Sequence, residues 1–278
     1  RSEALAPVLR KGRMARITHL ADGVSGLKGI LEPVKRRLDR APMMRKLGYK
    51  EYRVKHASGM KIDGKLDEAA WQQANVMDAF VPVPGIKKLA TEPLPSAGRN
   101  VQAWALYDDE ALYIAAEFSG VEPATMEYVK KSLTDRQGPP EHHGHCHRLG
   151  PTFELFMKPD LAEVLRWQVL MTVPNYFNGN VKHYFDPEDP FAANRWEPNP
   201  NFRYVITGEN GYRIEARIPF WTELKRPAKG TVWGVQMQLN KMLSSRKQPH
   251  WLYWWTFSDE DNSGLFSFDY PDGRWVFE

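Results

Sequence analysis

The sequence predicts an all-β protein, an antiparallel β-sandwich of the immunoglobulin-like or jelly-roll type that follows an N-terminal helical extension. Three observations favour this fold class: short runs of alternating apolar and polar residues recur, clusters of turn-forming residues separate them, and few segments have a helical period. The 278 residues are 42% hydrophobic, which is enough for a substantial buried core.

Residues 1–50 differ from the rest in charge and are expected to form a basic helical leader or linker. They hold 13 Lys and Arg against 4 Asp and Glu, a net charge of +9, so the remaining 228 residues carry −5 of the chain's total of +4. Apolar residues at three- and four-residue spacing from Leu27 to Leu38 predict one helical stripe. Such a leader is either a solvated helical extension or a segment that binds nucleic acid, anionic lipid or an acidic protein partner.

A second domain is expected to span residues 51–278 and to contain the strands. The alternation of apolar and polar residues is clearest in the segment 212–218. Arg213, Glu215 and Arg217 lie on one side of this predicted strand, and the apolar residues at 212, 214, 216 and 218 lie on the other. The acidic pair Asp108-Asp109 between two apolar runs predicts a hairpin. Strands are expected within 100–118, 152–158, 164–173, 202–220, 231–243, 250–257 and 264–270.

The stretch MKIDGKLDEAAWQQA at residues 60–74 is the most specific part of the sequence. Its apolar residues, Trp71 among them, are expected to pack as a plug on the edge of the sandwich. Gly64 fits a tight turn, and Asp67 is placed to cap a short helix that begins at Glu68.

This stretch resembles the opening of carbohydrate-binding modules of family 9, which are related in fold to DOMON domains. Later segments resemble that family's strands in the same order, and together they cover about residues 52–278. The resemblance implies non-catalytic binding of a glycan, associated with carbohydrate breakdown, in a secreted or periplasmic setting. The further segments are VQAWALYDDEALYIAAEF, TFELFMKPD, GYRIEARIPFWTEL, KGTVWGVQMQLNKM and WWTFSDEDNSGLFSF.

The resemblance also implies three ligand-binding residues on neighbouring strands. The family's strand glutamate matches Glu154, and the arginine of the next strand falls at Gln168, which keeps hydrogen bonding but loses the charge. The family's strand asparagine matches Asn240, for which a structural cross-strand role is equally open. Because Phe153 and Leu155 share one face of their strand, Glu154 is expected on the opposite face.

The resembled modules clamp a terminal sugar between two tryptophans, and this clamp is expected to be rebuilt or lost here. One of the two clamp positions falls at Arg148, which is therefore a candidate residue for contact with the sugar. The segment that should hold the second tryptophan is too short, although Trp254 and Trp255 lie just upstream as candidates. An acidic residue of the family's structural calcium site falls near Gly120, which puts that calcium in doubt.

The segment EHHGHCHRLG at residues 141–150 is a candidate metal site. In an extended segment His145 and His147 lie on the same side, with Cys146, the only cysteine, opposite. With a third ligand such as His143 they suit a divalent metal such as zinc, or copper, but their spacing fits no standard zinc pattern. Contact with a sugar and a solvated or partner-contacting loop remain alternatives.

The chain is expected not to be an enzyme, although it is a candidate partner of a glycoside-degrading one. It has no G-x-S-x-G, no Gly-rich phosphate loop and no H-E-x-x-H. One alternative is an accessory subunit that keeps the fold without sugar binding and joins a larger complex through its basic helix. A third is an electron-transfer subunit carrying a metal or haem b. We expect no nucleic-acid partner and, without about 18 consecutive apolar residues, no transmembrane segment.

Overall fold

The computed structural model describes the part of the chain that carries the expected sandwich. It covers residues 51–78, 80–82, 101–144, 146, 149–161, 166–182, 193–195, 198–220, 224–240, 251–254 and 273–278. The leader expected at 1–50 and the strand expected at 264–270 lie outside the described residues, so the domain boundary at residue 50 stays a prediction. The all-β prediction is confirmed, because strands make up most of the described chain.

Two helices and fourteen strands occur in this described part. The helices are α3 (Ala69–Gln73) and α5 (Pro123–Asp135). The strands are β1 (Glu51–His56), β2 (Val81–Pro82), β3 (Val101–Tyr107), β4 (Ala111–Phe118), β5 (Glu141–His142), β6 (Thr152–Lys158), β7 (Arg166–Thr172), β8 (Tyr176–Lys182), β9 (Ala193–Arg195), β10 (Asn201–Gly208), β11 (Gly211–Pro219), β12 (Val232–Asn240), β13 (Trp251–Trp254) and β14 (Gly273–Phe277).

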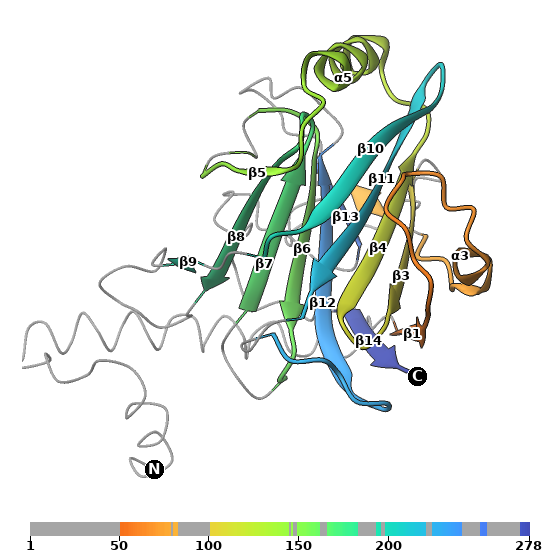
Figure 1. Ribbon diagram of the computed structural model, residues 1–278, viewed down its shortest axis with the longest axis vertical. Helices are drawn as coiled ribbons and strands as arrows, with labels where there is room; N and C mark the ends of the chain where they lie inside the picture. Colours follow the sequence, from red (N-terminus) through yellow and green to blue (C-terminus); the bar gives the residue numbers. More distant parts are fainter. Residues whose placement is uncertain are drawn as a thin grey trace, which may run out of the picture.

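The strands form one continuous sheet that curls into two packed layers (Figure 1). Its main path runs β10-β11-β4-β3-β1-β14-β12-β6-β7-β8-β5, and β13, β2 and β9 join from the side. Most neighbours are antiparallel, but β1 is parallel to both β14 and β3. Residues 51–54 of β1 pair with β14 and residues 55–56 with β3, so this strand passes from one layer to the other.

The two layers enclose a single large apolar core. The alternation expected in 212–218 is confirmed, because Tyr212 and Ile214 in β11 enter this core while Arg213 lies on the opposite face. Trp233 and Trp275 are among its largest fully buried side chains. Burial of one such side chain stabilises the fold by roughly 1.5–3 kcal/mol, so the core is the main source of stability.

Helix α5 closes one end of the sandwich and was not expected from the sequence (Figure 1). Pro123 begins the helix at a position where its missing N–H costs nothing. Met126 and Val129, three residues apart, both enter the core. The Tyr128 hydroxyl donates a hydrogen bond to the carbonyl oxygen of Leu149, which ties the helix to the loop before β6.

The 57–74 segment packs against the outer face of the layer that contains β3 and β4. The predicted plug therefore forms, but it lies on a face of the sandwich and not on its edge. Trp71 is buried there in a second, smaller apolar cluster with Leu106 and Tyr113. The expected cap at Asp67 is wrong: α3 has Glu68 as its N-cap residue, and no side chain makes a capping hydrogen bond. A helix of five residues held by a buried tryptophan depends on packing more than on a cap.

The turn at Gly64 is possible only for glycine. Its φ is +84°, and a Cβ atom there would lie 2.4 Å from Cγ1 of Val205 in β10. The predicted turn is therefore confirmed, and the absence of a side chain lets the turn press directly on the sheet.

A buried carboxylate holds this turn and helix to the sheet. Glu215 in β11 has no exposed area. Its Oε2 accepts the backbone N–H groups of Asp63 (3.0 Å) and Gly64 (2.7 Å), and its Oε1 accepts the indole N–H of Trp71 (2.9 Å). Burial raises the pKa of Glu215 above its ordinary value, although these hydrogen bonds counter the effect.

Arg213 makes a second attachment of the same turn. Its guanidinium nitrogen Nη1 donates to the carbonyl oxygens of Gly64 (3.2 Å) and Lys65 (2.7 Å). Its Nε donates to Oε2 of Glu117 on the neighbouring strand β4, at 2.9 Å. Glu215 and Arg213, which both lie on the outward side of β11, therefore hydrogen-bond to the 57–74 segment.

Replacing Glu215 with glutamine is expected to lower the free energy of unfolding by about 1–3 kcal/mol, because one amide oxygen cannot accept all three buried donors. Urea unfolding at neutral pH measures this loss. The matched control is Glu209→Gln in the adjacent, exposed turn, where a change within about 0.5 kcal/mol is expected. Equal losses in the two variants would contradict the role assigned to Glu215.

Candidate functional site

Buried polar side chains gather on one face of the sheet formed by β12, β6, β7 and β8, the face opposite the core. Nine polar or charged side chains are buried among the described residues, and six of them lie on this face. Buried polar groups require partners, so such a concentration indicates a binding role. The six residues, called here the polar face, are Thr152, Glu154, Gln168, Thr172, Asn178 and Gln236.

Strand alternation and register place the central pair of the polar face. In β6 Phe153 and Leu155 enter the core, so Glu154 lies on the opposite face, as predicted. In β7 Gln168 is paired with Phe156, two residues beyond Glu154. Glu154 and Gln168 are therefore diagonal neighbours on adjacent strands, within reach of each other.

Glu154 and Gln168 are joined by a hydrogen bond. Nε2 of Gln168 donates to Oε1 of Glu154. The exposed fractions of the two residues are only 5% and 2%. Within the described part of the chain, the buried amide oxygen of Gln168 has no hydrogen-bond partner. The pair implied by the family resemblance thus carries an acceptor atom that still requires a donor.

The remaining polar residues connect the face to its surroundings. Thr152 and Thr172 lie opposite each other, with their hydroxyl oxygens 3.2 Å apart, and Thr172 also donates to the carbonyl oxygen of Pro151 at 2.8 Å. Asn178 donates to the carbonyl oxygen of His143 at 3.4 Å. The threonines have a structural role, whereas Asn178 links the polar face to the histidine-rich loop.

Two further predicted residues lie in the same sheet. Asn240 ends β12, opposite Thr152 on one side and Trp251 on the other. Trp254 ends β13, paired with Met237. The register places Asn240 beside Thr152 on the polar face, whereas Trp254 is paired with Met237, whose side chain is in the core, so Trp254 occupies a position on the other side of the sheet. The predicted contact of both residues with a ligand stays a prediction.

The described residues of the histidine-rich loop, which exclude residues 145, 147 and 148, lie beside the polar face. The ring of His143 packs against Tyr176 with centroids 5.2 Å apart, and Cys146 is buried. No group of three or more His, Cys, Asp or Glu side chains that could hold a metal ion occurs in the described ranges. The roles predicted for His145, His147, Arg148 and Trp255 fall on residues outside those ranges and stay predictions.

A cation and an aromatic ring at the end of the polar face were missed by sequence reasoning. Tyr176 lies opposite Thr172 in β8, and the guanidinium of Arg136 sits 4.2 Å from the centroid of its ring. Arg136 also pairs with Glu141 at 2.6 Å. The segment from Tyr176 contains two asparagines and a glycine, which are typical of a loop and concealed the strand.

Gly150 sets the position of the histidine-rich loop relative to α5. A Cβ atom at this residue would lie 2.6 Å from the carbonyl oxygen of Val173 and 2.7 Å from Cε1 of Tyr128. By contrast, a Cβ atom at Gly144 in the same loop would meet no atom within 4 Å. Close packing of the helix, the loop and the end of β7 therefore requires a glycine at position 150.

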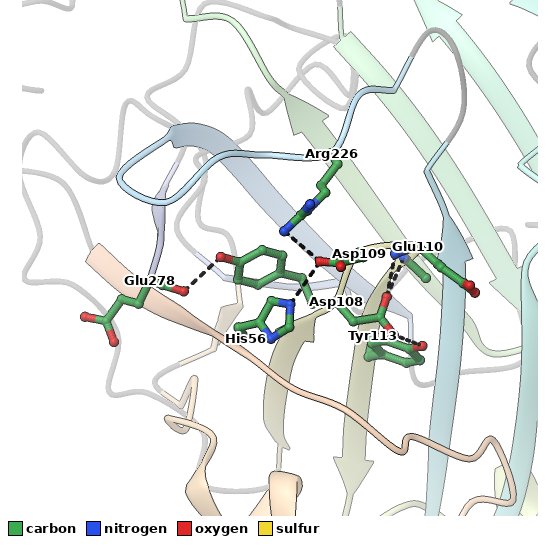
Figure 2. Close-up of polar contacts among 9 residues, drawn as sticks. His56, Asp108, Asp109, Glu110, Tyr113, Arg226 and Glu278 are labelled. Carbon is green, nitrogen blue, oxygen red and sulfur yellow. Dashed lines mark hydrogen bonds and ion pairs between the residues drawn. The ribbon is translucent and has the colours of Figure 1, made fainter.

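A second group of polar contacts surrounds the acidic turn between β3 and β4 (Figure 2). Oδ1 of Asp108 accepts the backbone N–H groups of Glu110 and Ala111, both at 2.8 Å, and Oδ2 accepts the Tyr113 hydroxyl at 2.7 Å. Burial alone would raise the pKa of Asp108, but the hydrogen bonds outweigh it and lower the pKa below its ordinary value. The hairpin predicted at this pair is confirmed.

The neighbouring residue of this turn joins separate segments through exposed contacts. Oδ1 of Asp109 lies 2.6 Å from a guanidinium nitrogen of Arg226 and 3.3 Å from Nε2 of His56, as Figure 2 shows. The side chain of Asp109 is 70% exposed, and exposed ion pairs contribute little stability. We therefore assign this turn a structural role, with Asp108 as its main element.

Replacing Asp108 with asparagine is expected to lower the free energy of unfolding by about 0.5–1.5 kcal/mol at neutral pH, because hydrogen bonds to the carboxylate are weakened. The folded-state pKa is depressed, so the carboxylate stabilises the protein above its unfolded-state pKa of about 3.9. This stabilisation is lost as the pH falls through the folded-state pKa.

Urea unfolding at a series of pH values tests this prediction. The difference between the wild type and Asp108→Asn should shrink on acidification, whereas the exposed control Asp109→Asn should stay within about 0.5 kcal/mol of the wild type at neutral pH. A difference that grows at low pH would contradict the assignment.

Replacing Gly150 with alanine is expected to destabilise the protein by about 1–3 kcal/mol, because the new methyl group overlaps a backbone oxygen and the Tyr128 ring. Gly144→Ala is the matched control in the same loop and should change the unfolding free energy by less than about 0.5 kcal/mol. Thermal and urea unfolding measure both. Equal stability of the two variants would show that the loop is not packed as described.

Comparison with solved structures finds the same fold in carbohydrate-binding proteins. A family 9 carbohydrate-binding module from Caldicellulosiruptor kristjanssonii, solved with cellotriose, aligns with a TM-score of 0.52 and 15% identity over 82% of this chain and 94% of that chain. The structure with glucose gives 0.51 and 15%, over 82% and 96%. A candidate carbohydrate-binding protein from Bacteroides uniformis gives 0.52 and 11%, over 83% and 100%.

Comparison of the sequence finds no matching family model and no matching curated protein. No helix of the described residues is long and apolar enough to cross a membrane. The structural matches, which span nearly the whole of the other chains, show that this protein has the fold of family 9 carbohydrate-binding modules, as the resemblance predicted.

Proposed function

We propose that this protein binds carbohydrate through the polar face of β12, β6, β7 and β8 and does not act on it as an enzyme. The observation that carries the proposal is the concentration of six of the nine buried polar side chains of the described residues on one sheet face. Amides and carboxylates exchange hydrogen bonds with hydroxyl groups, which a sugar presents in greater number than any other polar group.

Glu154 and Gln168 are the proposed centre of the site. Gln168 already donates to Glu154, and its amide oxygen still lacks a donor among the described residues. A sugar hydroxyl donating to that oxygen would satisfy it. Asn240 and Arg148 are proposed as further contacts, because they occupy positions that bind sugar in the resembled modules. Trp254 and Trp255 stay candidates only because they lie just upstream of the segment that holds the second clamp tryptophan there.

Tyr176 is proposed as an aromatic contact at the end of the face. It is held by the Arg136 guanidinium, and it lies opposite Thr172 of the polar face. Aromatic rings suit the apolar C–H faces of pyranose sugars, and an immobilised ring loses little entropy on binding. This residue would supply part of the stacking surface that the missing clamp tryptophan provides in the resembled modules.

A non-catalytic role fits the chemistry of the face. Glycoside hydrolysis ordinarily uses a pair of carboxyl groups on either side of the scissile bond. Glu154 is the one carboxyl group among the six buried polar residues of the face. The solved modules of the same fold bind cellotriose and glucose, which supports a binding function. A secreted or periplasmic setting belongs to this proposal, because polymeric glycans are met there.

Replacing Gln168 with leucine is expected to weaken glycan binding at least about tenfold, because the hydrogen bonds of the amide are lost. Glu154→Gln is expected to weaken it by a similar factor. A glycan array identifies a ligand for the full chain, and calorimetric titration with that ligand measures the affinities.

The control for both variants is Glu127→Gln on the exposed side of α5, which should leave affinity unchanged. Urea unfolding checks that each variant is folded. Unchanged affinity in both site variants would place the ligand elsewhere. An array on which the wild-type chain binds no glycan would overturn the proposal and favour the accessory-subunit alternative.

A further inference from the structure

Two Asn-Gly pairs occur in the chain, and the fold places them in opposite surroundings. They are Asn178-Gly179 in β8 and Asn210-Gly211 at the β10–β11 hairpin. In such a pair the backbone nitrogen of glycine can attack the side-chain amide carbon of asparagine, because glycine has no Cβ atom to obstruct the approach or restrict the backbone. The dipeptide is the same at both places, so the surroundings distinguish the two pairs.

Asn210-Gly211 lies at the exposed tip of its hairpin. Glu209 and Asn210 form the two-residue turn between Gly208 and Gly211, which are paired across β10 and β11. Both turn residues are exposed, so packing does not fix the Asn210 side chain. Exposed hairpin tips also open locally at a small cost in free energy, which lets the amide carbon of Asn210 and the Gly211 nitrogen meet.

The fold preserves this pair, because position 211 requires glycine. A Cβ atom there would lie 2.7 Å from Oγ1 of Thr207 and 2.9 Å from the carbonyl oxygen of Phe118. A side chain at position 211 would therefore shield the Asn210 amide only by displacing the hairpin from β4.

Asn178-Gly179, by contrast, is held inside the sheet. Asn178 pairs with Leu170 and Gly179 with Val169 in the register of β7 and β8. Asn178 is 8% exposed, and its Nδ2 donates to the carbonyl oxygen of His143 at 3.4 Å. In a strand the side chain stands roughly perpendicular to the sheet, so the amide carbon reaches the next backbone nitrogen only if the strand leaves the sheet.

We propose that Asn210 is a site of spontaneous deamidation and that the fold selects it over Asn178. The Gly211 nitrogen forms a bond to Cγ of Asn210 and loses its proton, the Cγ–Nδ2 bond breaks, and the side-chain nitrogen leaves as ammonia. Water then opens the resulting cyclic succinimide at either carbonyl carbon. The products are aspartate and isoaspartate, in which the main chain runs through the former side chain. Water is the only co-reactant, and the reaction is independent of sugar binding.

The modification changes the chain at its contact with the segment that leads into α5. The backbone oxygen of Asn210 accepts the N–H group of Val121 at 2.9 Å, and α5 begins shortly afterwards at Pro123. The hairpin tip lies at the same end of the sandwich as this helix (Figure 1). Both products add a negative charge beside Glu209, and isoaspartate also adds a carbon atom to the main chain. Deamidation therefore marks aged molecules at the junction of the hairpin and α5.

The test follows both pairs in the same sample of the full chain. The folded protein and the protein unfolded in guanidinium chloride are incubated at a mildly alkaline pH, and peptide mass spectrometry measures the gain of about 1 Da at each asparagine. In the folded protein Asn210 is expected to deamidate at least about tenfold faster than Asn178, because the sheet must open before Asn178 reacts. In the unfolded protein the two rates are expected to agree within about threefold, because the surroundings no longer differ.

Two variants assign the product to this turn. An isoaspartyl methyltransferase detects isoaspartate in the aged folded protein by transfer of a labelled methyl group. Asn210→Gln is expected to abolish this signal, because the longer side chain would have to close a larger ring. Asn201→Gln is the matched control, at an exposed asparagine of β10 that precedes phenylalanine, and it should keep the signal.

Comparable rates at the two pairs in the folded protein, or a faster reaction at Asn178, would overturn the proposal. A preference for Asn210 that persists in the unfolded chain would also overturn it, because the flanking sequence and not the fold would then select the site. A methylation signal that survives Asn210→Gln, or that disappears in Asn201→Gln, would place the reaction at another residue and contradict the assignment.

Discussion

The attachment of the 57–74 segment to the sheet depends on the buried carboxylate of Glu215. This carboxylate accepts hydrogen bonds from the turn at Asp63 and Gly64 and from the Trp71 indole, and so fastens the 57–74 segment to the sheet. A buried carboxylate is costly unless its oxygens are satisfied, so the turn and the strand stabilise each other. The 57–74 segment in turn covers the outer face of β3 and β4 in one layer, whereas the polar face lies on the other layer.

The same strand alternation serves two purposes in the two layers. In β11 an outward glutamate meets three donors of its own chain and becomes a structural anchor. In β6 the outward Glu154 meets the amide of Gln168, whose oxygen still has no partner in the described part of the protein. A buried polar group with every bond made rigidifies a fold, whereas an open acceptor beside a buried charge is what a ligand site requires. This contrast separates an anchor from a candidate site.

The surroundings of the polar face come from parts of the chain that lie far apart in sequence. Helix α5 holds the histidine-rich loop through the bond from Tyr128 to Leu149 and through close packing at Gly150. Asn178 bonds that loop from the sheet, and Tyr176 is held under Arg136. These contacts place His143, which packs on Tyr176, next to the polar face. In the resembled sugar-binding modules the corresponding loop contacts the ligand, and the sequence departs from them at the tryptophan clamp.

The fold class, the hairpin at Asp108-Asp109, the packing of Trp71 and the outward position of Glu154 could all be predicted from the sequence, because local alternation and turn chemistry report burial residue by residue. The sequence did not predict α5 or β8, because the residues of these two elements have only weak preferences for a helix or a strand. Only the tertiary structure decided that Glu215 partners Gly64, 151 positions away. It alone also decided that β1 bridges the layers in parallel and that Tyr176 joins the polar face. Those features depend on cross-strand register and long-range packing, which no local pattern encodes.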